Sequence, residues 1–185
     1  ATVFTGISNV FTELGTGEAL IRKKNPTNDF ISSIFWLNTG LAFFVCLILT
    51  AIASSVADLY GQDIVEILIY VLSIEILLSG INRVSHALLE KNMRFKAIAF
   101  AQITSQIFGA SIGITMAFLG YGLWSLVFLG ISSQLIYTII VNLALKWRPS
   151  VTFNFNHIKS IFSFSSYLTL VKILDHTQRR SEIFI

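Results

Sequence analysis

Four long apolar runs dominate the pattern of the chain, at residues 31–57, 64–89, 97–119 and 123–145. Each run is rich in Leu, Ile, Phe, Ala and Gly, and each is too long for a buried strand. A bilayer core about 30 Å thick needs about 20 apolar residues in a helix, because unpaired backbone amides are costly in hydrocarbon. The pattern therefore predicts four complete membrane-spanning helices.

Two shorter apolar runs flank these four. Residues 3–21 have the pattern of the end of an earlier span, and residues 158–174 have the pattern of the beginning of a later one. The chain does not begin with Met, and its first residues lack the basic region and cleavage site of a secretory signal. We expect an all-α, polytopic transmembrane helix bundle over residues 1–185, in a chain that is a piece of a longer protein.

Composition and charge agree with a membrane protein. Hydrophobic residues make up 54% of the chain and charged residues 12%, about half the charged share of a typical soluble domain. The net charge of +3 does not indicate a nucleic-acid partner, because the basic residues lie in short clusters between apolar runs. Cys46 is the single cysteine, which excludes a disulfide within the chain, and we expect it to be a small buried residue.

The basic residues alternate between connectors, which predicts the orientation of the chain. The connectors around Asp58 to Glu66 and at residues 119–122 hold no Lys or Arg. Nine of the 13 basic residues lie in the other connectors: Arg22, Lys23, Lys24, Lys91, Arg94, Lys96, Lys146, Arg148 and Lys159. Because Lys and Arg are retained on the cytoplasmic side during insertion, the basic connectors are predicted to be cytoplasmic.

Polar residues inside the second complete span fall on one helical face. Glu75, Ser79, Asn82 and His86 are spaced by four, three and four residues, so this stripe should face a cavity or a partner helix. One interpretation is a water-filled path in which Glu75 or His86 takes part in proton coupling or head-group contact. The other is hydrogen bonding between helices, typically worth about 0.6 to 2 kcal/mol a pair. Neighbouring Arg83 either belongs to the path or anchors the helix at the interface.

Two further spans carry polar or small residues for which packing is the favoured role. Gln102 and Gln106 share a face with Gly109 and Gly113, and small residues four apart let helices approach closely. In the next span Gln134 and Asn142 are interpreted as isolated residues that hydrogen-bond between helices.

A charged stripe lies in the last partial span. Lys172, Asp175 and Arg179 are spaced by three and four residues, so that Asp175 can pair with either base. A cationic wall would suit an anionic, phosphate-bearing substrate, and a salt-bridged helix end is the alternative. The candidate substrate-path residues are therefore Glu75, Asn82, Arg83, His86, Lys172, Asp175 and Arg179.

The sequence lacks the common motifs of enzyme chemistry. The chain has no P-loop, no HExxH, no GxSxG and no paired acids that would flank a cleft. We therefore expect no enzyme activity, no cofactor and no metal site, and any work must use a partner, a gradient or a concentration difference.

Several segments resemble a known family. These are residues 14–17 in FTELGTGEALIRKKN, Trp36-Leu37-Asn38, the cytoplasmic joining segment 87–96, and GYGLWSL at 120–126. Together they resemble the polysaccharide transporter branch (lipopolysaccharide, O-antigen and colanic-acid type flippases) of the multidrug/oligosaccharidyl-lipid/polysaccharide flippase superfamily. The likeness implies that the chain is most of one half of a two-bundle transporter.

The resemblance also implies an activity. Such proteins flip lipid-linked (undecaprenyl-pyrophosphate) oligosaccharide across the bacterial cytoplasmic (inner) membrane by alternating access. It implies the lipid bilayer and the lipid-linked oligosaccharide as partners, with polysaccharide polymerase and chain-length proteins as further candidates.

Three other functions stay open at this point. A multidrug or toxin exporter of the same superfamily would favour an acidic lumen, to which Glu75 could contribute. A membrane-embedded glycosyltransferase or polymerase would need a catalytic residue in a sizeable loop, and every loop here is short. The third alternative is a non-transporting assembly subunit.

Overall fold

The computed structural model describes residues 16–145 and 147–152, and its regular structure over these ranges is entirely α-helical. The four long helices begin and end within three residues of the predicted runs, and each is long and apolar enough to cross a membrane. The predicted fold class is therefore confirmed, and the chain is a multi-pass membrane protein. The helices are α2 (Thr16–Arg22), α3 (Asn28–Tyr60), α4 (Ile64–Lys91), α5 (Phe95–Phe118) and α6 (Leu123–Ala144).

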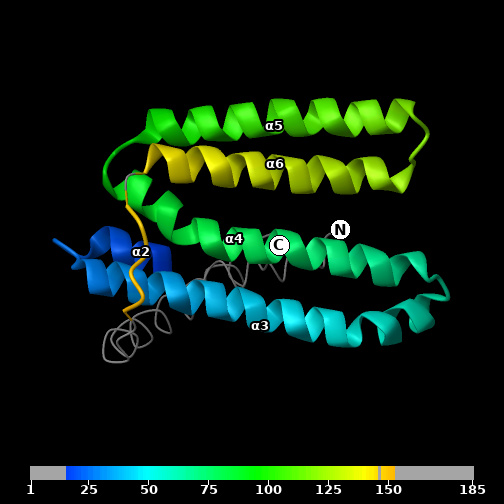
Figure 1. Cartoon of the computed structure of the whole chain (residues 1–185), viewed down its shortest axis with the longest axis horizontal. Coiled ribbons are helices and arrows are strands. Elements are labelled where there is room, and N and C mark those ends of the chain that lie inside the picture. Colours follow the sequence, from blue (N-terminus) through cyan, green and yellow to red (C-terminus); the bar gives the residue numbers. More distant parts are fainter. Residues whose placement is uncertain (1–15, 146, 153–185) are drawn as a thin grey trace, which may run out of the picture.

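The long helices run up and down, so that their connectors gather at two ends of the bundle (Figure 1). The described basic connectors, 23–27 and 92–94, lie at the same end as the C-terminus of α6. The opposite end holds the connectors 61–63 and 119–122, which have no Lys or Arg. We call these the cytoplasmic and the external end, following the charge rule.

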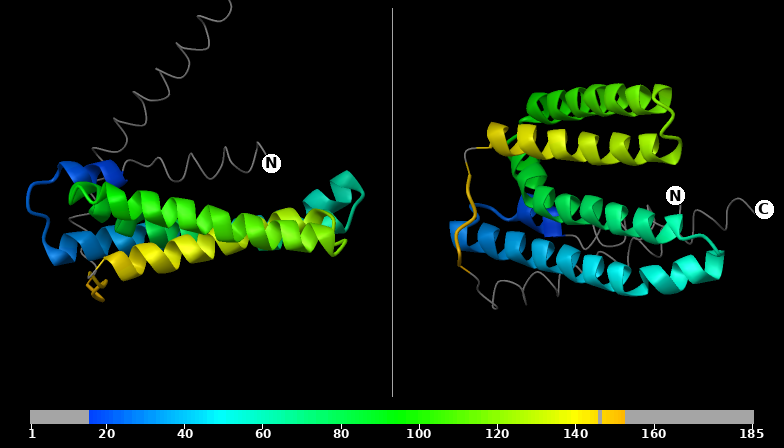
Figure 2. Two further views of the ribbon diagram at one scale, coloured as in Figure 1. Left: turned by 90° about the horizontal axis from the view of Figure 1, so that it is seen from above. Right: turned by 45° about the vertical axis from the view of Figure 1, so that its right-hand side comes forward.

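The helices form two closely packed hairpins, α3 with α4 and α5 with α6, while α2 packs on α4 and α3 (Figures 1 and 2). A Cβ on Gly80 would lie 2.5 Å from the Cβ of Ala42, and one on Gly113 would lie 2.8 Å from the Cβ of Leu129. Both distances are shorter than real contacts, so the close approach needs glycine. The predicted packing role of Gly109 and Gly113 is confirmed, because both lie against α6.

The described residues build two apolar clusters at different depths. The first, the cytoplasmic core, joins all five helices and comprises Leu20, Phe30, Ile31, Ile34, Val84, Ala87, Leu88, Leu89, Ile98, Ala101, Val141 and Leu145. The second, the external core, joins only α3 and α4 and comprises Ala42, Val45, Leu49, Ala53, Ile69 and Ile76. Cys46 is only partly buried, which corrects the expectation of a buried cysteine.

Basic side chains at the cytoplasmic end also cap helices. The Lys91 ammonium donates to the carbonyls of Leu20 at 3.1 Å and Ile21 at 2.9 Å, and the Arg94 guanidinium donates to the carbonyl of Ala144 at 2.7 Å. Because the last carbonyls of a helix lack partners within it, these bonds hold the end of α2 to the end of α4, and the end of α6 to the connector after α4.

The segment that follows α6 lies along the start of α3. The Trp147 indole N–H donates to Asn28 Oδ1 at 2.6 Å, and the Trp36 indole N–H donates to the Ser150 carbonyl at 2.9 Å. We call residues 147–152 the strap, because they connect the cytoplasmic ends of α6 and α3.

Candidate functional site

The predicted polar stripe of α4 faces a partner helix, α6. A Glu75 carboxylate oxygen occupies the space that a Cβ on Gly130 would need. Farther toward the cytoplasm, Asn82 Nδ2 donates to Thr138 Oγ1 at 2.5 Å. The structure therefore places Glu75 and Asn82 at the interface between the two hairpins.

His86 extends the stripe toward the cytoplasmic end. Its ring centroid lies 6.4 Å from that of Tyr137 in α6, and its Nδ1 lies 3.8 Å from the carboxylate of Glu90, one turn along α4. His86 therefore borders the interface while keeping an acidic neighbour on its own helix.

Helix α6 supplies a matching polar stripe that sequence reasoning missed. Gly130, Gln134, Thr138 and Asn142 are spaced by four residues, and Ser85 Oγ donates to Asn142 Oδ1 at 3.2 Å. The four-residue step was visible in the sequence, but Gln134 and Asn142 were interpreted as isolated. The predicted hydrogen bond of Asn142 between helices is confirmed. We call this interface the polar seam, and it comprises Glu75, Asn82, Ser85 and His86 with Gly130, Tyr137, Thr138 and Asn142.

A second polar contact lies on the α2 side of α4. Thr16 Oγ1 donates to Asn38 Oδ1 at 3.0 Å, with both side chains buried. A Cβ on the next residue, Gly17, would lie 3.6 Å from Nε of Arg83. Sequence reasoning had noted Asn38 only as part of a family-like segment, and the glycine-containing stretch around Gly17 gave no indication of its partner.

Arg83 is held against α2, eight residues before α4 ends at Lys91. Its Nε is buried and has no hydrogen-bond partner among the described residues. Since Asn82 contacts α6 and Arg83 contacts α2, neighbouring residues of α4 present polar groups to two different helices.

Some buried polar atoms around α4 have no hydrogen-bond partner among the described residues. They include Asn82 Oδ1, Arg83 Nε and Asn38 Nδ2. Asn82 is 4% exposed and Asn38 is 8% exposed. An unsatisfied buried polar atom costs about 1 to 3 kcal/mol, and such atoms ordinarily bind water or a ligand. Polar binding capacity is therefore present inside the bundle.

The remaining candidates are placed as follows. Lys172, Asp175 and Arg179 lie outside the described residues, so their part in a substrate path stays a prediction. Gln102 and Gln106 are exposed on α5. Within residues 16–145 and 147–152, no three metal-ligating side chains of His, Cys, Asp or Glu come together.

Comparison with known proteins identifies the family. The whole chain, residues 1–185, matches the family described as "Polysaccharide biosynthesis protein". The chain belongs to this family. The resemblance noted in the joining segment and the spans is thereby confirmed, and polysaccharide biosynthesis is the context of the protein. No solved structure gives a significant match.

Three curated relatives illustrate the similarity. The succinoglycan biosynthesis transport protein ExoT of Rhizobium meliloti is 28% identical over 82% of this chain and 31% of its own length. The teichuronic acid biosynthesis protein TuaB of Bacillus subtilis is 28% identical over 88% of the chain and 34% of its own length. The lipopolysaccharide biosynthesis protein WzxC of Escherichia coli is 19% identical over 94% and 36%. The chain thus spans about a third of the length of each relative.

Proposed function

We propose that this chain is part of a transporter that flips lipid-linked oligosaccharide across the bacterial inner membrane by alternating access. The substrate class is an undecaprenyl-pyrophosphate sugar unit. Membership of the polysaccharide biosynthesis family and the name of the relative ExoT, a transport protein, support transport rather than catalysis. Polysaccharide polymerase and chain-length proteins are the proposed partners in the same process.

The observation that carries this proposal is the set of buried polar groups on α3 and α4. Placing a charged side chain at the centre of a span costs about 2.5 to 3.5 kcal/mol on the insertion scale, so Glu75 and Arg83 need a compensating role. A sugar head group that crosses a membrane must exchange its hydrogen bonds to water for bonds to protein or trapped water. Asn82 Oδ1 and Asn38 Nδ2 provide an acceptor and a donor of this kind.

Charge complementarity supports the pyrophosphate part of the substrate. The Arg83 guanidinium is a permanent cation whose Nε–H has no hydrogen-bond partner in the part of the chain that the structure describes, and guanidinium groups bind phosphate oxygens strongly. Lys172 and Arg179 are the further cations proposed for the path, on the basis of their spacing in the sequence. The polyprenyl chain would stay in lipid while the head group follows the polar residues.

One feature favours the second candidate function, a multidrug or toxin exporter. Glu75 places a carboxylate against Gly130 in the same interface, and an acidic group inside a span suits a cationic substrate or a coupling ion. The two functions differ in the charge that the path must accept, so they can be separated by substitution of Arg83 and of Glu75.

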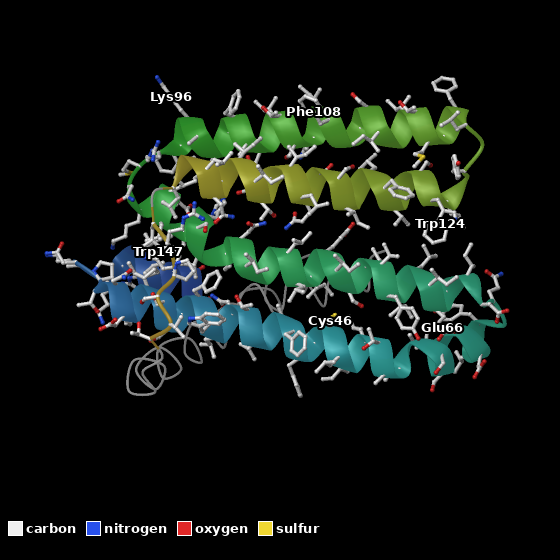
Figure 3. The ribbon with its side chains drawn as sticks, viewed as in Figure 1. Cys46, Glu66, Lys96, Phe108, Trp124 and Trp147 are labelled. Atoms are coloured by element: carbon white, nitrogen blue, oxygen red, sulfur yellow. The ribbon has the colours of Figure 1, made fainter. Side chains whose placement is uncertain are left out.

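The test is complementation of a flippase-deficient strain with the full-length protein. Surface polysaccharide and accumulated lipid-linked precursor are measured for wild type, Arg83→Ala, Arg83→Lys, Lys172→Ala and Arg179→Ala. We expect wild type to restore the polysaccharide, the Ala variants to accumulate precursor, and Arg83→Lys to retain partial function. Lys96→Ala is the matched control, because Lys96 is an exposed cation at the cytoplasmic end whose side chain points away from the bundle (Figure 3).

Two outcomes would contradict the proposal. One is failure of the wild-type protein to restore polysaccharide while it confers drug resistance that depends on Glu75. The other is restoration that is equally efficient with Arg83→Ala, which would remove the cation from the path.

A further inference from the structure

Each hairpin is packed in a way that resists separation. Gly80 lets α4 approach α3 so closely that an added Cβ would lie 3.1 Å from the carbonyl oxygen of Asn38. Within the other hairpin an added Cβ on Gly109 would lie 2.9 Å from the carbonyl oxygen of Leu129. Parting either pair of helices would open a void along a close backbone contact, which water cannot replace favourably. Each hairpin should therefore move as one body.

The interface between the hairpins has a different chemistry. Along the polar seam the contacts are hydrogen bonds and small polar side chains, as in the pairs Asn82 with Thr138 and Ser85 with Asn142. Water that enters between the hairpins takes over both sides of such a hydrogen bond, so the loss on separation along a hydrated path is small. The bundle is therefore easiest to part between α4 and α6.

Contact between the hairpins is also uneven along its length. The cytoplasmic core includes residues of both α4 and α6, whereas among the described residues the external core is confined to α3 and α4. Glu75 against Gly130 is the most external of the contacts that make up the polar seam. Figure 1 and the right-hand view of Figure 2 both show α4 and α6 close at the cytoplasmic end and diverging toward the external end.

The cytoplasmic end carries additional ties between the two bodies. Arg94, just after α4, donates to the last turn of α6 at Ala144. The strap carries Trp147, which contacts α3 through Asn28 and packs its ring edge-on against Phe35 with centroids 6.0 Å apart. These ties would hold the cytoplasmic ends together while the external ends change their separation.

We propose that the α3/α4 and α5/α6 hairpins are two rigid bodies hinged at the cytoplasmic core, and that the distance between α4 and α6 widens and narrows at the external end. The contact of Glu75 with Gly130 marks the inner limit of this movement. The inference rests on the proposed function, because the motion would give a transported head group its exit on the external side.

The test measures distances between pairs of spin labels in the full-length protein in lipid bilayers, after replacement of native cysteines, Cys46 included. One pair spans the hairpins at the external end, one spans them at the cytoplasmic end, and one lies within a single hairpin. The exposed positions chosen are Ile67 with Leu126, Asn92 with Leu143, and Phe118 with Leu126. Electron paramagnetic resonance then reports the distance distribution of each pair.

We expect the external pair, Ile67 with Leu126, to show a broader distribution than either of the other pairs. In Gly130→Val the added side chain must displace the end of the flexible Glu75 side chain from the interface, so any change in this external distance should be outward. Gly40→Val is the matched control, because a Cβ at Gly40 of α3 meets nothing within 4 Å. The wild-type comparison needs no variant, so the inference is tested even where Gly130→Val fails to fold.

An external distribution as narrow as that of Asn92 with Leu143 would overturn the hinge. A cytoplasmic pair that is broader than the external pair would overturn it too. These distances do not depend on transport. Complementation without external broadening would refute the hinge alone, and external broadening without complementation would refute the proposed function alone.

Discussion

The cytoplasmic and external halves of the bundle are built differently, although the same long helices run through both. In the cytoplasmic half one apolar core joins all five described helices, α2 through α6. Hydrogen bonds from Lys91, Arg94 and the strap also hold helix ends together there. In the external half the described apolar core joins only α3 and α4. The comparison shows that cohesion in this bundle depends on depth, which allows one end to stay closed while the other moves.

The largest expected effect is a loss of stability when a buried leucine of the cytoplasmic core is replaced by alanine, and it distinguishes the two cores. Leu89 is 0% exposed in the cytoplasmic core and Leu49 is 6% exposed in the external core. We expect Leu89→Ala to destabilise the protein by about 2 to 5 kcal/mol, because the cavity lies where several helices meet, and Leu49→Ala to cost less. Thermal unfolding of the full-length protein in detergent measures both. Leu143→Ala, at an exposed leucine, is the control, and equal losses for Leu89→Ala and Leu49→Ala would remove the distinction.

The next effect concerns the caps at the cytoplasmic end. Lys91→Met keeps much of the side-chain length but removes the charge-assisted bonds to the carbonyls of Leu20 and Ile21, so we expect a loss of about 1 to 3 kcal/mol. The same thermal measurement applies. Lys96→Met removes an equal charge at an exposed position and should change little. Equal losses for the two variants would show that net charge, not capping, is what matters.

A smaller effect is expected in the polar seam. A double-mutant cycle of Asn82→Ala and Thr138→Val should give a coupling energy of about 0.6 kcal/mol, and not above roughly 1.7, as for other hydrogen bonds between spanning helices. The cycle combines the unfolding free energies of the single and double variants. A coupling energy well above this range would mean that this bond, on the closed side of the Glu75 contact, ties α4 to α6 more strongly than hydrogen bonds between spanning helices usually do, and would contradict a weak polar contact between the hairpins.

The smallest effect is expected for the strap. Trp147→Phe keeps an aromatic ring beside Phe35 but loses the hydrogen bond to Asn28, so the change in stability should be at most about 1 kcal/mol. Limited proteolysis after α6 should nevertheless become faster, because the strap loses a tie to α3. Unchanged proteolysis would show that the remaining bonds of the strap to α3, among them those of Ser150 with Trp36 and Ser32, are enough to hold it.

The sequence predicted the helices well and their contacts only in part. The four runs were predictable because hydrocarbon forces every backbone amide into a helix, whatever the helix packs against. The face that carries Glu75, Asn82 and His86 was also predictable, because it depends only on helical spacing. The helix that this face contacts could not be predicted. Opposite Glu75, α6 has Gly130, which contributes no side chain and so leaves room for the Glu75 carboxylate.

Arg83 shows the same limit. Its position in α4 was read from the sequence, which left both an interfacial anchor and a path residue open. The structure places its Nε beside Gly17 of α2, 66 positions away in the sequence, and no local pattern encodes that contact. The roles of Lys172, Asp175 and Arg179 stay predictions that only the proposed complementation tests.

The sequence by itself determined that this chain crosses a membrane, where its spans lie and which end bears the basic connectors. Those properties follow from the local balance of apolar and charged residues against a slab of hydrocarbon. Only the tertiary structure decided which helices pair, that the cytoplasmic core joins five helices, and that a polar seam separates two hairpins. The hydrophobic effect does not favour contact of an apolar residue with a neighbouring helix over contact with lipid. Helix pairing therefore depends on glycine contacts and hydrogen bonds between residues far apart in the chain.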